Sequence, residues 1–280
     1  MAKVLIVGCG DLGLAIADLL AERHAVFGLR RQASAGQPNI TMLQGDVTAP
    51  ASLQALHTLN PELIVYCVAA DEQTDAAYQA QYVTGLAHVL ATQRENRALR
   101  RVFFISSTRV YGQDEGEWLD EATPASPIDF AGQRLLQAEQ LLQGLPCGAT
   151  ALRLSGLYGP GRFRMINMVM NQAWPPQNSW SNRIHRDDAA AFTAFLMEQV
   201  LAGQGLAPCY IVSDDGPAPI YEVLTYLAEQ MQLAQPENWQ QAAEGGKRLN
   251  SSLMQASGFK LRYPDYQAGY LALLLNWHRA

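Results

Sequence analysis

The hydrophobic positions at the start of the chain form a short apolar run followed by a helical pattern. Lys3–Val7 is almost uninterrupted in its apolar character, as expected for a strand buried on both faces of a parallel sheet. From Asp11 to Arg23, apolar residues recur at the spacing of one helix face. The pattern therefore predicts a strand, a sharp turn and a helix.

The same alternation of apolar runs and helical patterns continues to about residue 155. The further predicted strands are Ala25–Leu29, Ile40–Leu43, Leu63–Ala69, Val102–Ser106 and Ala149–Leu154, and a long helix is predicted over Asp75–Asn96. The later chain is less regular, with a strand predicted at Cys209–Val212 and helices near Asp187–Leu201, Tyr221–Gln232 and Tyr266–Trp277.

This order of elements predicts an α/β fold, a doubly wound parallel sheet of the Rossmann type with a smaller C-terminal substrate lobe. We expect residues 1–155 to form the nucleotide-binding domain, with residues 185–215 returning to it. Residues 156–184 and 216–280 are expected to form the smaller lobe.

Three glycines, Gly8, Gly10 and Gly13, lie in the turn between the first strand and the first helix. In that context the first permits a tight turn, the second lets the backbone approach a diphosphate, and the third lets helix and strand pack closely. We predict coenzyme contacts from Gly8, Gly10, Asp11, Leu12 and Gly13. The alternative is a glycine-rich turn without a ligand.

Composition excludes several classes of function. The net charge is −6 and the arginines are scattered, which argues against a nucleic-acid partner. The four cysteines are widely separated and show no metal-ligand spacing, so we predict no metal site and a reducing cytoplasm. No signal peptide or membrane segment is indicated, and the expected partner is a small-molecule substrate.

The end of the second strand bears on the choice of coenzyme. It carries Arg30 and Arg31 and no acidic residue. A carboxylate at this position favours NAD, whereas two guanidinium groups can hold the 2′-phosphate of NADP. We therefore predict NADP in preference to NAD, the alternative being that both arginines are solvated. Further predicted coenzyme contacts are Asp46, which could instead cap a short turn, and Val47, Ala69 and Ser106.

A family resemblance rests on several motifs in order along nearly the whole chain. They are SSTRVYG at the end of the strand Val102–Ser106, Glu121–Pro124, RLSGLYGPGR over Arg153–Arg162, and NRIHRDD over Asn182–Asp188. With these motifs the chain resembles the extended short-chain dehydrogenases/reductases, the NAD(P)-dependent epimerase/dehydratase family. The resemblance implies a nicotinamide coenzyme, a carbonyl or nucleotide-sugar-like substrate, and a homodimer.

The chain departs from the family at two places. Its glycine turn is GxGxxG instead of GxxGxxG, and the family's catalytic Tyr-x-x-x-Lys falls on Phe130 and Arg134. A phenylalanine has no proton to give, and an arginine keeps its charge but does not exchange protons near neutral pH. Arg134 could still orient ribose, phosphate or a carbonyl.

Other predicted site residues follow from the family's motifs. Ser107, and beside it Thr108, are placed where the family has a hydroxyl for the reacting carbonyl, although a strand-ending turn is the alternative. Tyr111, Tyr158 and His185 are candidate replacements for the acid/base group, each with a structural alternative. Candidate substrate contacts are Tyr158, Arg162 and Arg183.

Three functions are compatible with these residues. The first is an atypical reductase, epimerase or dehydratase in which the acid/base group has moved. The second is a catalytically silent NADP-binding sensor or scaffold. The third is a protein-interaction module, since function resides in the site and not in the fold.

Overall fold

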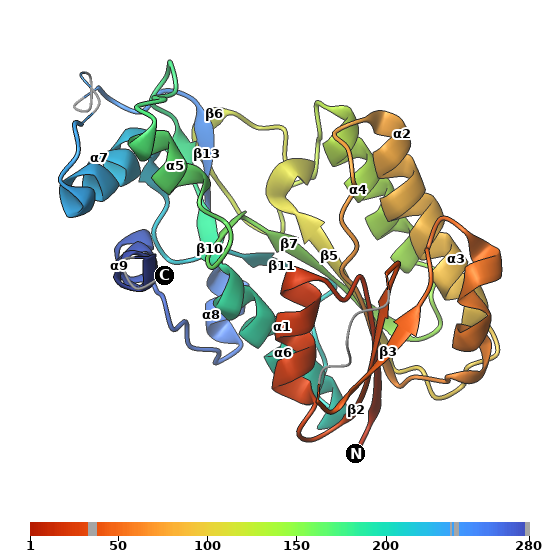
Figure 1. Ribbon diagram of the computed structural model, residues 1–280. Coiled ribbons are helices and arrows are strands. Elements are labelled where there is room, and N and C mark those ends of the chain that lie inside the picture. Colours follow the sequence, from red (N-terminus) through yellow and green to blue (C-terminus); the bar gives the residue numbers. More distant parts are fainter. Residues whose placement is uncertain (33–37, 236, 238–240, 278–280) are drawn as a thin grey trace. The chain divides into compact units, whose positions relative to one another are not determined.

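The structure, a computed structural model, describes residues 1–32, 38–235, 237 and 241–277. The chain divides into two compact units (Figure 1). The N-terminal unit is formed by Met1–Gly112, Ala125–Arg153 and Ala190–Tyr210, and the C-terminal unit by Gln113–Pro124, Leu154–Ala189 and Ile211–Ala280. The segment 113–124, which the sequence patterns assigned to the nucleotide-binding domain, is part of the C-terminal unit.

The main sheet has seven strands in the order β11-β7-β5-β4-β1-β2-β3. Their bounds are β1 (Lys3–Val7), β2 (Ala25–Arg30), β3 (Ile40–Gln44), β4 (Leu63–Tyr66), β5 (Arg101–Ser107), β7 (Gly148–Leu154) and β11 (Cys209–Val212). The pairs from β3 to β5 are parallel. The predicted doubly wound α/β fold is confirmed.

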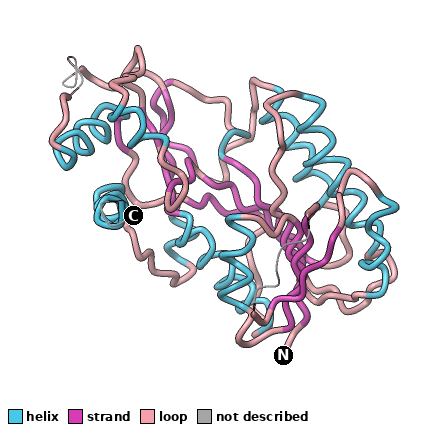
Figure 2. Tube along the Cα trace, viewed as in Figure 1, coloured by secondary structure: helices cyan, strands magenta, loops and turns pink. Residues whose placement is uncertain are grey.

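Helices cover both faces of this sheet (Figures 1 and 2). On one face lie α1 (Asp11–Leu20) and α6 (Arg186–Leu201), and on the other α2 (Asp75–Tyr78), the π-helix η2 (Gln79–Thr84), α3 (Gly85–Thr92) and α4 (Phe130–Leu142). Short 3₁₀ helices are η1 (Pro50–Thr58) and η3 (Thr108–Val110). The register sets Val7 beside Tyr66 and Tyr66 beside Phe104, so these strands end at one edge.

The predicted helix Asp75–Asn96 is divided into three pieces, and its last helical residue is Thr92. A buried side chain from β4 accounts for the π-helical piece. The Tyr66 hydroxyl donates a hydrogen bond to the Gln81 carbonyl, and a Cβ at Gly85 would lie 2.6 Å from that hydroxyl oxygen. A phenol inserted into the helical ladder widens it locally.

The C-terminal unit has two small sheets, one of order β12-β9-β13-β6 and a parallel pair, β10-β8. Their strands are β6 (Glu115–Leu119), β8 (Gly156–Tyr158), β9 (Trp180–Ser181), β10 (Arg183–His185), β12 (Ala218–Pro219) and β13 (Gly246–Leu249). The helices are α5 (Arg164–Met170), α7 (Ile220–Met231), α8 (Ser252–Ala256) and α9 (Tyr266–Trp277). The pairing of β6 with β13 explains why segment 113–124 belongs here.

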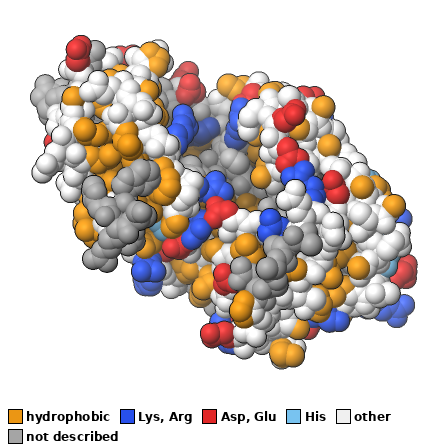
Figure 3. Space-filling view, viewed as in Figure 1, with side chains coloured by type: hydrophobic (Ala, Val, Ile, Leu, Met, Phe, Trp, Pro, Cys, Tyr) orange, Lys and Arg blue, Asp and Glu red, His pale blue; other side chains and the backbone are white. Residues whose placement is uncertain are grey.

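The core of the C-terminal unit joins Tyr158, Ile166, Leu224 and Tyr270 among others. On the viewed face of this unit, apolar side chains gather over α5, α7 and α9 (Figure 3), and Met170 is half-exposed. Within the described residues, no helix combines the length and hydropathy needed to cross a membrane. The same residues contain no cluster of three or more potential metal ligands.

Candidate functional site

The glycine turn after β1 has the geometry that the sequence assigned to each glycine. Gly8 has a φ of +88°, which favours glycine. A Cβ at Gly13 would lie 2.4 Å from the Gly8 carbonyl oxygen, whereas a Cβ at Gly10 would meet nothing within 4 Å. The turn is therefore tight at Gly8, packed against α1 at Gly13 and open at Gly10.

The amino terminus of α1 follows this open position. Gly10 is the N-cap residue and, having no side chain, makes no capping hydrogen bond of its own. The Gly8 and Cys9 amides both donate to the Leu29 carbonyl at 3.0 Å, which fixes the turn against β2. Burial raises the pKa of Cys9 to about 11, so this cysteine is not a reactive thiolate. A helix terminus with glycine as its N-cap residue, behind an open turn, fits a diphosphate.

The two arginines at the end of β2 have different surroundings. Arg31 is exposed and forms a bidentate ion pair with Asp71, at 2.5 and 2.6 Å. This hydrogen bond lowers the pKa of Asp71 and raises that of Arg31. Arg30 is half-buried, and no described carboxylate pairs with it. Arg30 is thus a cation without a counter-ion, whereas Arg31 already has one.

The remaining predicted coenzyme contacts differ in exposure and in hydrogen bonding. Asp46 accepts from the Thr48 amide at 2.8 Å, which is the turn-capping alternative considered for it. Val47 is buried, and Ala69 is exposed after β4. Ser106 is 4% exposed and donates to Glu139 Oε1 at 2.6 Å. The Ser106 hydroxyl is therefore committed to the interior, which does not fit the predicted coenzyme contact.

The end of β5 presents the predicted hydroxyl groups. Ser107 is half-buried, and its oxygen accepts from the Arg109 amide at 3.2 Å, which starts η3. Because this bond uses an oxygen lone pair, the Ser107 hydroxyl proton is still available to donate. Thr108 is 9% exposed. Ser107 is the more accessible of the two.

The two residues that replace the family's catalytic pair both contact α2. Phe130 packs edge-on against Tyr78, with ring centroids 5.5 Å apart. Arg134 forms a bidentate pair with Asp75, at 2.7 and 2.9 Å, and donates to Gln137 at 2.9 Å. The pair with Asp75 raises the pKa of Arg134 and lowers that of Asp75. Arg134 is therefore held in place as a permanent cation.

Tyr78 is a phenol that the sequence patterns did not single out. It lies at the end of α2, 6% exposed, and its hydroxyl donates to Gln73 Oε1 at 3.0 Å. The same oxygen accepts from Arg109 Nη1 at 3.5 Å. No motif marks Tyr78, because it reaches Phe130 only through the packing of α2 on α4.

Tyr111 does not fit the predicted role of acid/base replacement. It is 1% exposed, and its hydroxyl accepts from Arg153 Nη1 at 2.7 Å. Arg153 in turn makes a bidentate pair with Glu139, the shorter contact being 2.7 Å. Burial lowers the pKa of Arg153, but Glu139 more than offsets this and raises it. This buried network of Ser106, Tyr111, Glu139 and Arg153 is a structural feature of the N-terminal unit.

In the C-terminal unit, the structure brings two predicted substrate residues together. Arg183 is 5% exposed, Tyr158 4% and Asp214 1%. Burial raises the pKa of the Tyr158 phenol, and the charges of Asp214 and Arg183 also act on this pKa, the first raising it and the second lowering it. Three of their polar atoms, Tyr158 Oη, Arg183 Nη1 and Asp214 Oδ2, have no hydrogen-bond partner among the described residues. Burial raises the pKa of Asp214 to about 8, against the lowering effect of Arg183. Asp214 had no motif to mark it.

Of the other two predicted residues of this unit, His185 is buried and Arg162 is exposed. His185 is 1% exposed, and burial lowers its pKa. Its Nδ1 accepts from the Asp187 amide at 3.2 Å, which leaves the proton of the neutral ring on Nε2. With Nδ1 occupied and Nε2 protonated, the ring has no lone pair free for a base. Arg162 is exposed in the turn after β8.

Comparisons with known proteins give a consistent result. The model of the NAD dependent epimerase/dehydratase family matches residues 4–205, which is more than half of the chain. A solved structure from Methylobacillus flagellatus, assigned as a NAD-dependent epimerase/dehydratase, is 44% identical, with 99% of each chain covered and a TM-score of 0.89. A comparison with curated proteins found no match.

Two more distant structures share the fold. The Bordetella bronchiseptica enzyme WbmH, solved with NAD⁺, is 20% identical with a TM-score of 0.75, covering 96% of this chain and 95% of its own. WbmG from the same organism, solved with NAD and UDP, is 18% identical with a TM-score of 0.78, covering 99% and 96%.

Proposed function

Because the chain belongs to the NAD-dependent epimerase/dehydratase family, we propose that it is an enzyme that binds a nicotinamide dinucleotide and acts on a carbonyl or hydroxyl carbon of a nucleotide-sugar-like substrate. The observation that carries the proposal is the glycine turn. Its open position at Gly10 is also the N-cap of α1, which carries no side chain of its own, and such a terminus attracts a diphosphate. When bound, the coenzyme would supply hydride transfer.

The proposed coenzyme is NADP in preference to NAD. Arg30 would meet the 2′-phosphate directly, because it has no counter-ion among the described residues. Arg31 would meet it in competition with Asp71. The Arg30→Ala/Arg31→Ala variant should bind NADPH and NADH equally in a fluorescence titration. Asp71→Asn should raise the affinity for NADPH alone, by about fivefold; an equal gain for NADH would contradict this assignment.

The proposed catalytic groups are at the end of β5. Ser107 would donate its free hydroxyl proton to the reacting oxygen, with Thr108 beside it. Arg134 would orient the coenzyme or substrate as a cation, because it does not exchange protons near neutral pH. Tyr78 would replace the missing phenol, because its ring packs against Phe130. Its hydroxyl proton, which Gln73 Oε1 accepts in this structure, would have to pass to the substrate oxygen instead.

The proposed substrate contacts are Tyr158 and Arg183, with Arg162 as an exposed cation nearby in the chain. Two of them carry buried polar atoms without a described partner. Buried polar groups are nearly always hydrogen-bonded, so these atoms are suited to a polar group of the substrate. His185 is proposed as a positioning residue through its contact with Tyr158, with ring centroids 5.2 Å apart.

Calorimetry on the folded full chain tests the central step, with NADPH, NADP⁺, NADH and NAD⁺ titrated separately. Gly10→Val should abolish binding by filling the open position. Gly144→Val is the matched control, because a Cβ there also meets nothing within 4 Å, and it should bind as the unaltered chain does. Absence of binding by all four coenzymes would overturn the proposal.

Turnover is tested next with a panel of nucleotide sugars. Chromatography of the products is the readout for an epimerase or dehydratase, which returns the hydride to its substrate, and absorbance of the reduced coenzyme is the readout for a net reductase. Tyr78→Phe should lower the rate by about 10²–10⁴, the usual contribution of a general acid or base. Tyr111→Phe is its control and should leave the rate nearly unchanged. Equal losses in both variants, at unchanged coenzyme affinity, would contradict the role of Tyr78.

A further inference from the structure

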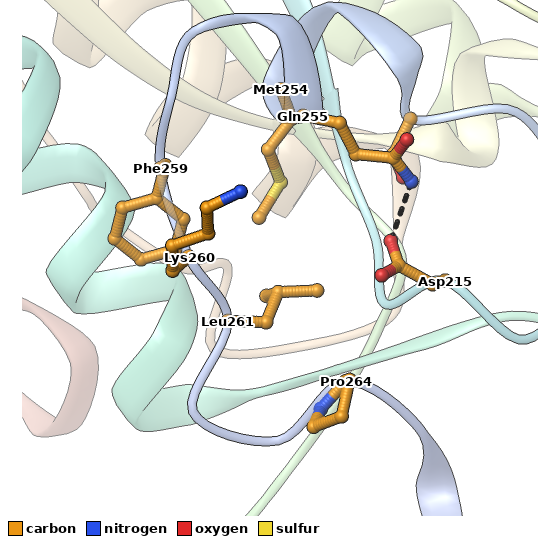
Figure 4. A pocket seen from close by; sticks show the side chains of 8 residues that line it. Asp215, Met254, Gln255, Phe259, Lys260, Leu261 and Pro264 are labelled. Atoms are coloured by element: carbon orange, nitrogen blue, oxygen red, sulfur yellow. Dashed lines mark hydrogen bonds between the residues drawn. The ribbon is translucent and has the colours of Figure 1, made fainter.

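A pocket in the C-terminal unit lies outside every residue assigned above. It has a volume of about 330 Å³ and is formed by α8, the segment from α8 to α9, and Asp215 after β11 (Figure 4). This volume is at the lower end of the range for small-molecule sites. None of its lining residues belongs to the glycine turn, the end of β5 or the buried group of Arg183 and Asp214.

Part of the pocket wall is apolar, and the rest is polar. Met254, Phe259, Leu261 and Pro264 contribute their side chains, and Met254 is 2% exposed. Met254 comes from α8, whereas the other three follow it in the chain. Such a surface favours an aliphatic group.

One cation reaches over this wall. The side chain of Lys260 extends toward Met254, so that its ammonium group faces the pocket (Figure 4). No carboxylate among the described residues pairs with it. By contrast, Lys3, at the start of β1, donates to the Leu59 carbonyl at 2.7 Å.

One anion lies on the other side. Asp215 Oδ1 accepts from Gln255 Nε2 at 2.6 Å, and the Asp215 amide donates to the Pro264 carbonyl at 3.0 Å. These two bonds fix the carboxylate at the rim, and none of the described cations pairs with it. Both charged residues are solvent-exposed. The pocket therefore combines an anion held by hydrogen bonds, a cation without a partner among the described residues, and an apolar patch.

We propose that this pocket binds a free α-amino acid with an aliphatic side chain. Its carboxylate would pair with Lys260, its ammonium group with Asp215, and its side chain would cover Met254 and Leu261. A zwitterion matches two unpaired charges of opposite sign, whereas an anion alone would meet Asp215 unfavourably and a cation alone would meet Lys260 unfavourably. This site uses none of the residues of the proposed enzymatic function.

The test is an NMR titration of the ¹⁵N-labelled full chain with L-leucine. Binding should perturb resonances of residues that line the pocket. Lys260→Gln and Asp215→Asn should each weaken it by about fivefold, as expected for a solvent-exposed ion pair. The double variant should lose about 25-fold if the two charges act independently. Lys247→Gln removes the same charge from β13 and should leave the affinity unchanged.

Ligand analogues separate the contributions. N-acetyl-leucine lacks the ammonium group and leucinamide lacks the carboxylate, so each should bind about fivefold more weakly than leucine. Glycine lacks the aliphatic side chain and should bind more weakly as well. Equal affinity for all four compounds, unchanged affinity in Lys260→Gln, or no perturbation at about 10 mM leucine, where even a millimolar site is mostly filled, would overturn the proposal.

Discussion

Two buried arginines, one in each unit, differ in how completely their polar atoms are paired. Arg153 is 8% exposed and shares Glu139 with the Ser106 hydroxyl, while its other nitrogen donates to Tyr111. Arg183 is 5% exposed, and its Nη2 donates to Ser181 Oγ at 2.5 Å. Its Nη1 has no described partner.

This difference separates a structural network from a candidate binding site. A buried ion pair with all its hydrogen bonds made is costly to break, because each remaining charge is left unpaired in the interior. Removing a buried group that is incompletely paired lowers the free energy of unfolding by less, because fewer hydrogen bonds are lost. Such groups are suited to a ligand that supplies the missing partner.

The largest effect is expected from breaking the paired network. Glu139→Leu leaves Arg153 buried without a carboxylate and Ser106 without an acceptor, so the free energy of unfolding should fall by about 3–5 kcal/mol. Arg183→Leu should cost only about 1–2 kcal/mol, since it removes an incompletely paired group. Urea unfolding of both variants measures the two losses.

The control for this comparison is Glu139→Leu combined with Arg153→Met. Replacing both partners with apolar residues should recover most of the lost stability. Equal losses in Glu139→Leu and Arg183→Leu would show that the two arginines are equally well paired, which would remove the basis of the comparison.

A smaller effect is expected where α9 covers Tyr158. A Cβ at Gly269 would lie 1.8 Å from the Tyr158 hydroxyl oxygen, so Gly269→Ala should destabilise the chain by about 1–3 kcal/mol despite the better helix propensity of alanine. Tyr158→Phe removes an unpartnered hydroxyl and should change stability by less than about 1 kcal/mol.

The double variant sharpens this prediction. Thermal or urea unfolding should show that Tyr158→Phe recovers about 1 kcal/mol of the loss in Gly269→Ala, because the closest atom is gone. Gly216→Ala is the control, since its Cβ would meet only the Asp265 Cβ, at 3.7 Å. Strictly additive effects of the two substitutions would contradict the contact.

The main sheet could be predicted because its strands are continuous apolar runs. All four residues of β4, Leu63–Tyr66, are buried. The continuous apolar run in the sequence therefore matches a strand that is covered on both faces. The small strands of the C-terminal unit could not, because Trp180–Ser181 and Ala218–Pro219 are only two residues long. Strands of that length have no periodicity, and their pairing depends on segments far apart in the sequence.

The candidate site was predictable only where local chemistry decides the role. The glycine turn is local in its spacing, since Gly13 packs on the Gly8 carbonyl, but the close approach of Gly8 to the Cys67 backbone depends on β4. The partners of Arg31 and Arg134 are Asp71 and Asp75, which lie 40 and 59 residues away in the chain. No spacing rule links such residues, so neither ion pair could be read from the sequence.

The stability contributed by the incompletely paired group should depend on pH. Burial raises the pKa of Asp214 to about 8, above the value of about 4 expected in the unfolded chain. Its contribution to stability is complete below about pH 4 and is lost as the pH rises through about 8, because only the unfolded state releases the proton between these values.

Asparagine cannot ionise, so Asp214→Asn should gain stability relative to the unaltered chain between about pH 5 and pH 8, by about 1 kcal/mol or more. Arg183 lowers the pKa of Asp214. In the Arg183→Leu background this pKa should be higher, so the loss of stability with rising pH should continue to higher pH. Urea unfolding at several pH values measures both effects. A difference that does not change with pH would mean that Asp214 is ionised throughout, and Arg183 would then be as well compensated as Arg153.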